Sequence, residues 1–126
     1  MTAAYLDSSV VTAIAFAEPG AGDLRRRLQQ LSLLFSAPLL EAEVRSAATR
    51  EGVPVDEGWF DPITWVIPEL SLRPEIIRVL DQGYVRGADC WHLATALHLA
   101  GEPGQIIFLT LDQRQRDLAR RLGFAV

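Results

Sequence analysis

Four acidic residues stand where a folded chain could bring them together. Asp7 in AYLDSSVV and Asp112 in IIFLTLDQR each follow an apolar run typical of a buried strand. Glu43 in APLLEAEVRSAA and Asp89 in RGADCWHLATAL lie on the apolar face of helix-like runs. A carboxylate on such a face costs free energy unless something compensates it, and a divalent metal is the usual compensation. Oxygen ligands of this kind favour a hard cation, Mg²⁺ or Mn²⁺.

Each of these acids also has a purely structural interpretation. Asp7 and Asp89 each stand at the start of a predicted helix, where a short acceptor caps free backbone N–H groups. Asp112 and Gln115 make the D-x-x-Q pattern of a capping box. Ser9 and its neighbour could cap the first helix instead, which would leave Asp7 free for other chemistry. The metal hypothesis therefore rests on the joint placement of the four acids.

Helix geometry separates Glu43 from its neighbour Glu41. Two residues apart on a helix are roughly 200° apart around its axis, so these side chains cannot share one face. Glu43 lies with Leu40 and Val44 on the apolar stripe, whereas Glu41 is four residues before Arg45 and can form an exposed ion pair. Glu43 is therefore the candidate ligand. The alternative for Glu43 is a buried salt bridge to an arginine.

Other polar residues have weaker functional interpretations. His92, one turn after Asp89, is expected to be a half-buried, hydrogen-bonded histidine rather than a ligand. Asp117 has Arg114 and Arg121 at helical spacing, which predicts a solvated ion pair. Whether His92 or Asp117 contributes to the site stays open. The run Arg25–Arg27 predicts a solvated helix face, or alternatively an edge that contacts phosphate.

The pattern of apolar runs predicts an α/β fold. Short strands alternate with helices, which implies a parallel sheet covered on both faces, and in such sheets the functional crevice lies beyond the carboxyl ends of the strands. Ser36 is expected to cap the third helix. Strands are predicted at residues 3–6, 33–36, 65–67 and 106–109, with a fifth edge strand at 124–126. Helices are predicted at 9–17, 23–31, 38–51, 72–82, 88–100 and 113–122, with a short one at 55–62.

Length and composition limit the possibilities. The 126 residues, 49% of them apolar, predict a single domain. The net charge is −4 and all 12 basic residues are arginine, so a Walker P-loop and a Schiff-base lysine are excluded. One cysteine, Cys90, suits a reducing compartment. Because no leader is recognisable and no apolar stretch is long enough to span a bilayer, we expect a cytoplasmic protein without a membrane segment.

Four segments carry a resemblance to a known family. They are YLDSSVV, LLEAEVRSA, GADCWHLATAL and FLTLDQRQRDLARRLG, and they resemble the signature segments of PIN-domain ribonucleases, more narrowly of the VapC toxins of bacterial toxin–antitoxin pairs. The resemblance spans nearly the whole chain in the usual order. It implies one PIN domain over residues 1–126, a three-layer α/β/α structure with four to five parallel strands. Cys90 departs mildly from the family, which usually has a small residue there.

The resemblance also implies site residues and partners. Asp7, Glu43, Asp89 and Asp112 match the acidic metal-binding and catalytic residues of the family, and Thr110 and Ser9 match hydroxyl residues that support them. The implied activity is a Mg²⁺- or Mn²⁺-dependent endoribonuclease that cleaves RNA with a metal-activated water and acts as the toxin of a type II pair. The implied partners are a VapB-type antitoxin protein, the RNA substrate and a second copy of the chain in a homodimer.

Two other function classes compete with this interpretation. An aspartyl phosphatase or a receiver-like domain needs a lysine, and the phosphatase also needs a second aspartate two residues after the first; position 9 is serine here and the chain contains no lysine. A catalytically silent PIN-like module would use its acids only to hold an arginine of a partner protein. Loss of metal would abolish cleavage but leave that kind of binding intact, so the two are distinguishable.

Overall fold

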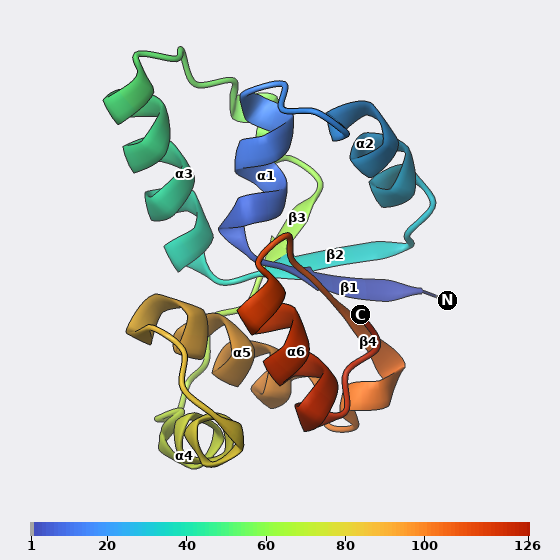
Figure 1. Cartoon of the computed structure of the whole chain (residues 1–126), viewed down its shortest axis with the longest axis vertical. Helices are drawn as coiled ribbons and strands as arrows, with labels where there is room; N and C mark the ends of the chain where they lie inside the picture. The colour runs from blue at the N-terminus through green and yellow to red at the C-terminus, as the bar shows by residue number, and fades with distance from the viewer. Residues whose placement is uncertain (1) are drawn as a thin grey trace.

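A four-stranded parallel sheet forms the centre of the molecule (Figure 1). The computed structural model describes residues 2–126. The strands are β1 (Ala3–Leu6), β2 (Leu33–Ser36), β3 (Ile63–Trp65) and β4 (Ile106–Leu109), in the spatial order β3-β2-β1-β4. All three strand pairs are parallel. The predicted parallel α/β architecture is thus confirmed.

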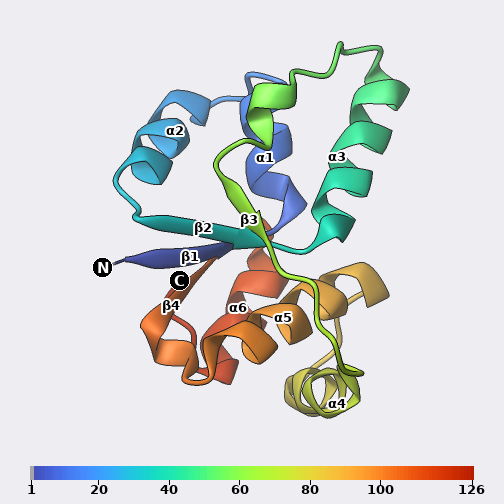
Figure 2. The same cartoon turned by 180° about the vertical axis from the view of Figure 1, so that it is seen from behind.

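Helices cover both faces of the sheet and make the predicted three layers (Figures 1 and 2). One face carries α1 (Ser8–Ala15), α2 (Ala21–Gln29) and α3 (Pro38–Glu51). The other carries α5 (Gly87–Ala100) and α6 (Gln113–Leu122), with α4 (Arg73–Gln82) packed on the outer side of α5. Short 3₁₀ turns occupy Glu57–Trp59 and Pro103–Gln105. None of the described helices is long and apolar enough to cross a membrane.

The strand order places the carboxyl ends of β1 and β4 side by side at a reversal of the chain path. The chain moves outward from β1 to β2 to β3 and then returns to the other side of β1 to form β4. Because parallel connections are right-handed, this reversal sends the later helices to the opposite face of the sheet. The pairing of Leu6 with Leu109 makes β1 and β4 end at the same level. A reversal of this kind is where α/β sheets form their ligand sites.

Alternating side chains of β1 connect two hydrophobic cores. Ala4 and Leu6 pack in the core under α1 and α3, and Tyr5 packs in the core under α5 and α6. Successive side chains of a strand point to opposite faces, so a single strand contributes to both cores. Tyr5 stacks on Phe108, with ring centroids 5.5 Å apart. β1, which directly precedes Asp7, is therefore packed on both faces of the sheet.

Several predicted details are wrong. The third strand is Ile63–Trp65, two residues earlier than predicted, and the short helix at 55–62 is a single 3₁₀ turn. Residues 124–126 contribute one bridge, Ile107 to Ala125, rather than a strand. Ser36 does not cap α3: its hydroxyl donates to the Leu6 carbonyl at 2.7 Å, and Ala37 takes the cap position. Ser36 is fully buried, so its hydroxyl satisfies the sheet rather than the helix end.

Candidate active site

Asp7 is held in a buried corner where β1 and β4 end. Its side chain is 4% exposed, and two hydroxyl groups donate to it: Ser9 Oγ to Oδ1 at 2.5 Å and Thr110 Oγ1 to Oδ2 at 2.7 Å. Asp7 stands at the cap position of α1, yet within the described residues its carboxylate makes no capping hydrogen bond. The two hydroxyls come from positions 101 residues apart, so the sheet is what assembles this corner.

Asp112 does cap a helix, and it also faces the crevice. Its Oδ1 accepts the Gln115 backbone N–H at 2.8 Å, while its own N–H donates to Thr110 Oγ1 at 3.0 Å. The reciprocal half of the predicted capping box is absent from the described residues. Gln115 is fully buried and its Nε2 donates to the Asp89 carbonyl at 3.3 Å. Capping uses one oxygen of Asp112 and leaves Oδ2 for other partners.

The pKa of Asp89 is influenced by the charges of two other candidate acids, Glu43 and Asp112. It lies in the first turn of α5, and its side chain is 17% exposed. Burial raises the pKa of Asp89, and the negative charges of Asp112 and Glu43 raise it further, while Arg86 opposes the shift. Burial also raises the pKa of Asp7, and Asp89 adds to that increase. The four acids predicted from the sequence therefore share one electrostatic environment.

A hydrogen-bonded chain of two side chains, Tyr5 and His92, holds Glu43. The Ala37 backbone N–H donates to the Tyr5 hydroxyl at 3.1 Å. The Tyr5 hydroxyl lies 2.8 Å from His92 Nδ1, and His92 Nε2 lies 2.6 Å from Glu43 Oε1. A neutral imidazole satisfies this chain: Tyr5 donates to Nδ1, and Nε2–H donates to Glu43. Burial raises the pKa of Tyr5 well above its ordinary value, so its hydroxyl keeps its proton.

His92 is therefore more buried than the sequence predicted. We expected a half-buried histidine, whereas its side chain is 1% exposed. The expected hydrogen bonding is present, but its partner is the candidate acid Glu43. The alternative for Glu43, a salt bridge to arginine, does not occur among the described residues. The reason is that the middle of α5 is buried on almost all sides, although Gly87, Ala88 and Trp91 in its first turns are exposed. His92 lies on the inner side of the helix, where it meets Tyr5 of β1 and Glu43 of α3.

Glu41 is engaged elsewhere, as its position on α3 predicted. Arg45 Nε donates to Glu41 Oε2 at 2.7 Å, and the same guanidinium makes two bonds to Glu57 at 2.6 and 2.9 Å. These side chains are all more than one third exposed, so the ion pairs contribute little to stability. Glu41 and Glu43 thus have different partners although they are two residues apart.

Asp117 forms the predicted exposed ion pair, but its partner is Arg120 and not one of the two predicted arginines. It accepts from Gln113 Nε2 at 2.7 Å and contacts Arg120 Nη1 at 3.4 Å, rather than pairing with Arg114 and Arg121. Arg114 instead lies over the ring of Tyr84. The spacing rule identified neighbours three and four residues away correctly but could not choose among them.

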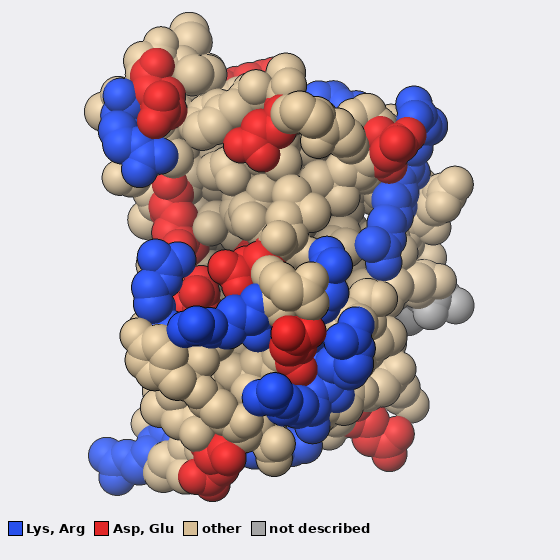
Figure 3. All heavy atoms as spheres, in the orientation of Figure 1, with Lys and Arg blue, Asp and Glu red and all other residues tan. Residues whose placement is uncertain are grey.

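Asp7, Glu43, Asp89 and Asp112 share one site, which we call the acidic crevice. In this structure they do not surround a position where a metal ion would be coordinated. Figure 3 shows acidic atoms in a hollow where the N-terminal ends of α3, α5 and α6 approach one another, with basic atoms on its rim. Within residues 2–126, no group of three or more His, Cys, Asp or Glu side chains is close enough to hold a metal ion. The donor chemistry still suits a hard cation, because the four candidates are carboxylates and the negative charges of Asp112 and Glu43 add to the raised pKa of Asp89.

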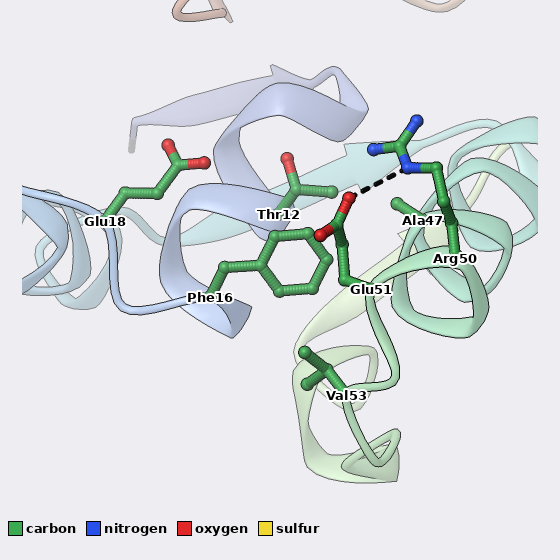
Figure 4. Close-up of a pocket in the computed structure, with 7 residues that line it drawn as sticks. All are labelled: Thr12, Phe16, Glu18, Ala47, Arg50, Glu51 and Val53. Carbon is green, nitrogen blue, oxygen red and sulfur yellow. Dashed lines mark hydrogen bonds and ion pairs between the residues drawn. The ribbon is translucent and has the colours of Figure 1, made fainter.

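A separate pocket lies at the other end of α1 and carries no comparable chemistry. It has a volume of about 480 Å³ and opens between the C-terminal ends of α1 and α3 (Figure 4). An exposed pair, Arg50 to Glu51 at 3.0 Å, spans part of its wall. Its lining is Thr12, Phe16, Glu18, Ala47, Arg50, Glu51 and Val53, none of which was a candidate site residue.

Sequence reasoning overlooked two residues that support the acidic group. Tyr5 orients His92, and Gln115 joins α6 to Asp89 on α5. A signal for Tyr5 was present, because a tyrosine inside a buried strand needs a partner for its hydroxyl. Gln115 had been considered only as a capping residue. Its real role depends on the distance between two helices, which no local pattern records.

Comparison with known proteins agrees with this architecture. The PIN domain family model matches residues 4–121. The chain is 35% identical over 132 aligned residues to a protein of Mycobacterium tuberculosis named Ribonuclease VapC46, in an alignment that covers 100% of this chain and 97% of the relative. No solved structure matches at a significant level. The match to the family model and the full-length relative both extend over the strands and helices that carry the four acids, so the chain belongs to the PIN domain family and, within it, to the VapC group.

Proposed function

We propose that this protein is a metal-dependent endoribonuclease and the toxin of a type II toxin–antitoxin pair. The observation that supports it most is the convergence of Asp7, Glu43, Asp89 and Asp112 on one crevice, in a chain of the PIN family. The similar protein from Mycobacterium tuberculosis carries the name ribonuclease, which supports RNA as the substrate. An acidic crevice repels phosphate by itself, so cleavage requires a cation there.

Three aspartates are the proposed holders of that cation. Asp7 offers lone pairs that remain after its bonds to Ser9 and Thr110, and Asp112 offers the oxygen not used in capping. Asp89 is electrostatically linked to both, because its charge raises the pKa of Asp7 and the charge of Asp112 raises the pKa of Asp89. Mg²⁺ or Mn²⁺, when bound, supplies a Lewis acid that activates water and neutralises the phosphate. The hydroxyls of Ser9 and Thr110 keep the Asp7 carboxylate in one orientation.

Glu43 is the proposed acceptor of a proton from the attacking water. His92 occupies Oε1 of Glu43, and Oε2 has no hydrogen-bond partner among the described residues, so it is available as an acceptor. Holding one oxygen fixes the other, and a positioned base contributes about 10²- to 10⁴-fold to a rate. Tyr5 and His92 take no part in bonds to substrate in this proposal; they position Glu43.

The proposed partners are a VapB-type antitoxin and a second copy of the chain. Several large apolar side chains are exposed, and they support a homodimer because monomers seldom leave such patches uncovered. Four of them lie on α4 and the segment before it: Ile67 at 73%, Leu70 at 77%, Ile77 at 54% and Leu80 at 47% exposure. We propose the cytoplasm as the site of action, where RNA and the antitoxin meet.

The decisive experiment is RNA cleavage by the purified, antitoxin-free protein. Total cellular RNA is incubated with Mg²⁺, with Mn²⁺ and with EDTA, beside an Asp89→Asn variant whose folding is checked by circular dichroism. We expect cuts at discrete sites with either metal, and their loss with EDTA and in the variant. Equal cutting by Asp89→Asn would reject the proposed site.

The same experiment separates the catalytic proposal from a silent binding module. A module that uses its acids only to hold a partner's arginine would cut no RNA under any condition, yet would still bind its partner in EDTA. Isothermal titration with Mg²⁺ gives a second readout. We expect binding to the unmodified protein and at least about tenfold weaker binding to Asp89→Asn, as loss of one carboxylate ligand predicts.

A further inference from the structure

We propose that Arg27, Arg116 and Arg120 form a phosphate-binding pocket that holds the RNA backbone beside the acidic crevice. We call it the arginine pocket. The inference rests on the proposed ribonuclease function and adds to it a place where the substrate strand is held outside the metal-binding acids. It also gives a role to one member of the Arg25–Arg27 run and not to the other two.

The arginine pocket lies along the outer edge of β4, between the end of α2 and one face of α6. Its volume is about 220 Å³. β4 is the last strand of the sheet, and a single bridge to Ala125 covers its edge. In the described part of the chain, the lining contains three cationic side chains and no Asp or Glu side chain: Arg27, Phe108, Leu109, Thr110, Arg116, Arg120 and Val126.

Three arginine residues line one pocket although like charges repel. Arg116 and Arg120 are four residues apart on α6, where like charges destabilise a helix. Arg27 joins them from the last turn of α2. Among residues 2–126, no ion pair provides a carboxylate to Arg27 or Arg116, and Arg120 has only a 3.4 Å contact with Asp117. A bound phosphate would relieve this repulsion with charge-assisted hydrogen bonds.

Arg116 is already oriented for such a ligand. Its side chain is partly buried, and Nη2 donates to the Thr110 carbonyl at 2.9 Å. One of the five N–H donors is thereby used to fix the planar group, and the others remain for an anion. The structural alternative is that Arg27 and Arg120 merely complement the negative ends of their helices. That alternative explains each arginine alone, but not why three of them line one pocket.

Thr110 links the arginine pocket to the acidic crevice. Its hydroxyl donates to Asp7 Oδ2 at 2.7 Å, and its carbonyl accepts from Arg116. A strand cleaved at the acids carries further phosphates on both sides of the cut, so one of them can reach the pocket. Since the chain has a net charge of −4, a local positive region of this kind would favour RNA binding beyond what a metal in the crevice supplies. This adjacency favours RNA over an acidic protein segment as the ligand.

The salt dependence of RNA binding tests the proposal. A labelled single-stranded RNA is titrated with the Asp89→Asn protein by fluorescence anisotropy, at fixed Mg²⁺ and varied KCl. This protein, which is expected not to cleave the RNA, is the parent into which the arginine substitutions are introduced. Arg27→Gln and Arg120→Gln are compared with Arg26→Gln and Arg121→Gln, their sequence neighbours. The neighbours are matched controls, because Arg26 pairs with Asp23 and Arg121 donates to the Gln82 carbonyl. All variants carry the same loss of one charge.

We expect each pocket variant to weaken RNA binding several-fold. We also expect the plot of the logarithm of the association constant against the logarithm of the KCl concentration to become less steep. Its slope should decrease in magnitude by about 0.7, the value for one lost phosphate contact on a single strand. The control variants should keep the slope of the parent protein. Equal slopes in pocket and control variants would overturn the proposal, as would failure of the parent protein to bind RNA. If the pocket variants lose affinity only for a polyglutamate peptide, the ligand is an acidic protein segment and the proposal is wrong.

The two proposals can fail separately. Cleavage of RNA by the unmodified protein decides the ribonuclease function without reference to the arginines. If cleavage is observed while the pocket and control variants share one KM, the function stands and the arginine pocket is rejected. If the arginine pocket holds the RNA, we expect KM to rise in Arg27→Gln and kcat to change little, because the phosphate it holds is remote from the bond that breaks.

Discussion

The two walls of the acidic crevice hold their carboxylates in different ways. On the sheet side, two hydroxyls donate directly to Asp7, one to each oxygen, and the group is almost entirely buried. On the helix side, a single ring nitrogen of His92 contacts one oxygen of Glu43, whose side chain is 28% exposed. Asp7 is therefore fixed at both oxygens, whereas Glu43 is held at one and keeps the other free.

This difference matches the roles proposed for the two residues. A ligand that must present a constant geometry benefits from several fixed partners, and a base must have an oxygen that can accept and release a proton. It also shows where each wall is vulnerable. Removing Asp7 changes the electrostatics of the buried corner, and removing the support of Glu43 changes only the orientation of one side chain.

The largest effect is expected on the helix side of the acidic crevice, where the test compares the activities of variants at Glu43 and Glu41 on α3. We expect Glu43→Gln to lower kcat by about a hundredfold or more, as loss of a positioned base does. Glu41→Gln should leave kcat within about twofold, because its bond to Arg45 is an exposed pair. Rates are measured on one RNA substrate at saturating Mg²⁺. The reverse ranking would show that helix geometry selected the wrong acid.

A smaller effect is expected when the support of Glu43 is removed. His92→Leu should lower kcat by about tenfold with KM unchanged, since loss of an outer partner of a site typically costs about 10- to 100-fold. His92→Gln retains a donor near the position of Nε2 and should recover most of the rate. If both variants lose the same stability but only Leu loses rate, His92 positions Glu43. Equal rates in the two variants would reduce His92 to a packing residue.

The smallest expected effect concerns the thermal stability of the protein without metal, and it tests Asp7 on the sheet side of the acidic crevice. Because burial raises the pKa of Asp7, the folded chain binds more protons than the unfolded chain above the ordinary pKa of 3.8. The free energy of unfolding then falls as pH rises through the folded pKa. Asp7→Asn removes this contribution, so in EDTA its Tm should exceed that of the unmodified protein, by roughly 4 °C for each kcal/mol.

The control for that prediction is the dependence on pH and on metal. The difference in Tm between Asp7→Asn and the unmodified protein should be larger near about pH 8 than near about pH 5, where protonation already relieves the buried charge. Mg²⁺ should raise the Tm of the unmodified protein more than that of the variant, through binding linkage. A difference that grows as pH falls would contradict the raised pKa of Asp7.

Much of the fold was predictable because its signals are local. The bounds of β1, β2, β4 and α6 agree with the predicted ranges residue for residue, since buried parallel strands are continuous apolar runs and Gly123 marks the end of α6. The third strand was misplaced because residues 63–67 (ITWVI) all suit a strand, and pairing with β2 decides which three of them join the sheet. The predicted Ser36 cap failed because a buried hydroxyl takes the nearest acceptor in space.

The sequence by itself determined which acids were candidates and which side of α3 faces inward, because helical periodicity and strand ends are properties of neighbouring residues. Only the tertiary structure decided what holds them. Thr110 meets Asp7 across 103 residues of chain, and His92 reaches Glu43 across 49. It also separated Arg27 from Arg25 and Arg26, since only its place beside β4 puts one of three like residues in the arginine pocket. Contacts of this kind depend on how the sheet and the helices pack, and the spacing of neighbouring residues does not determine that packing.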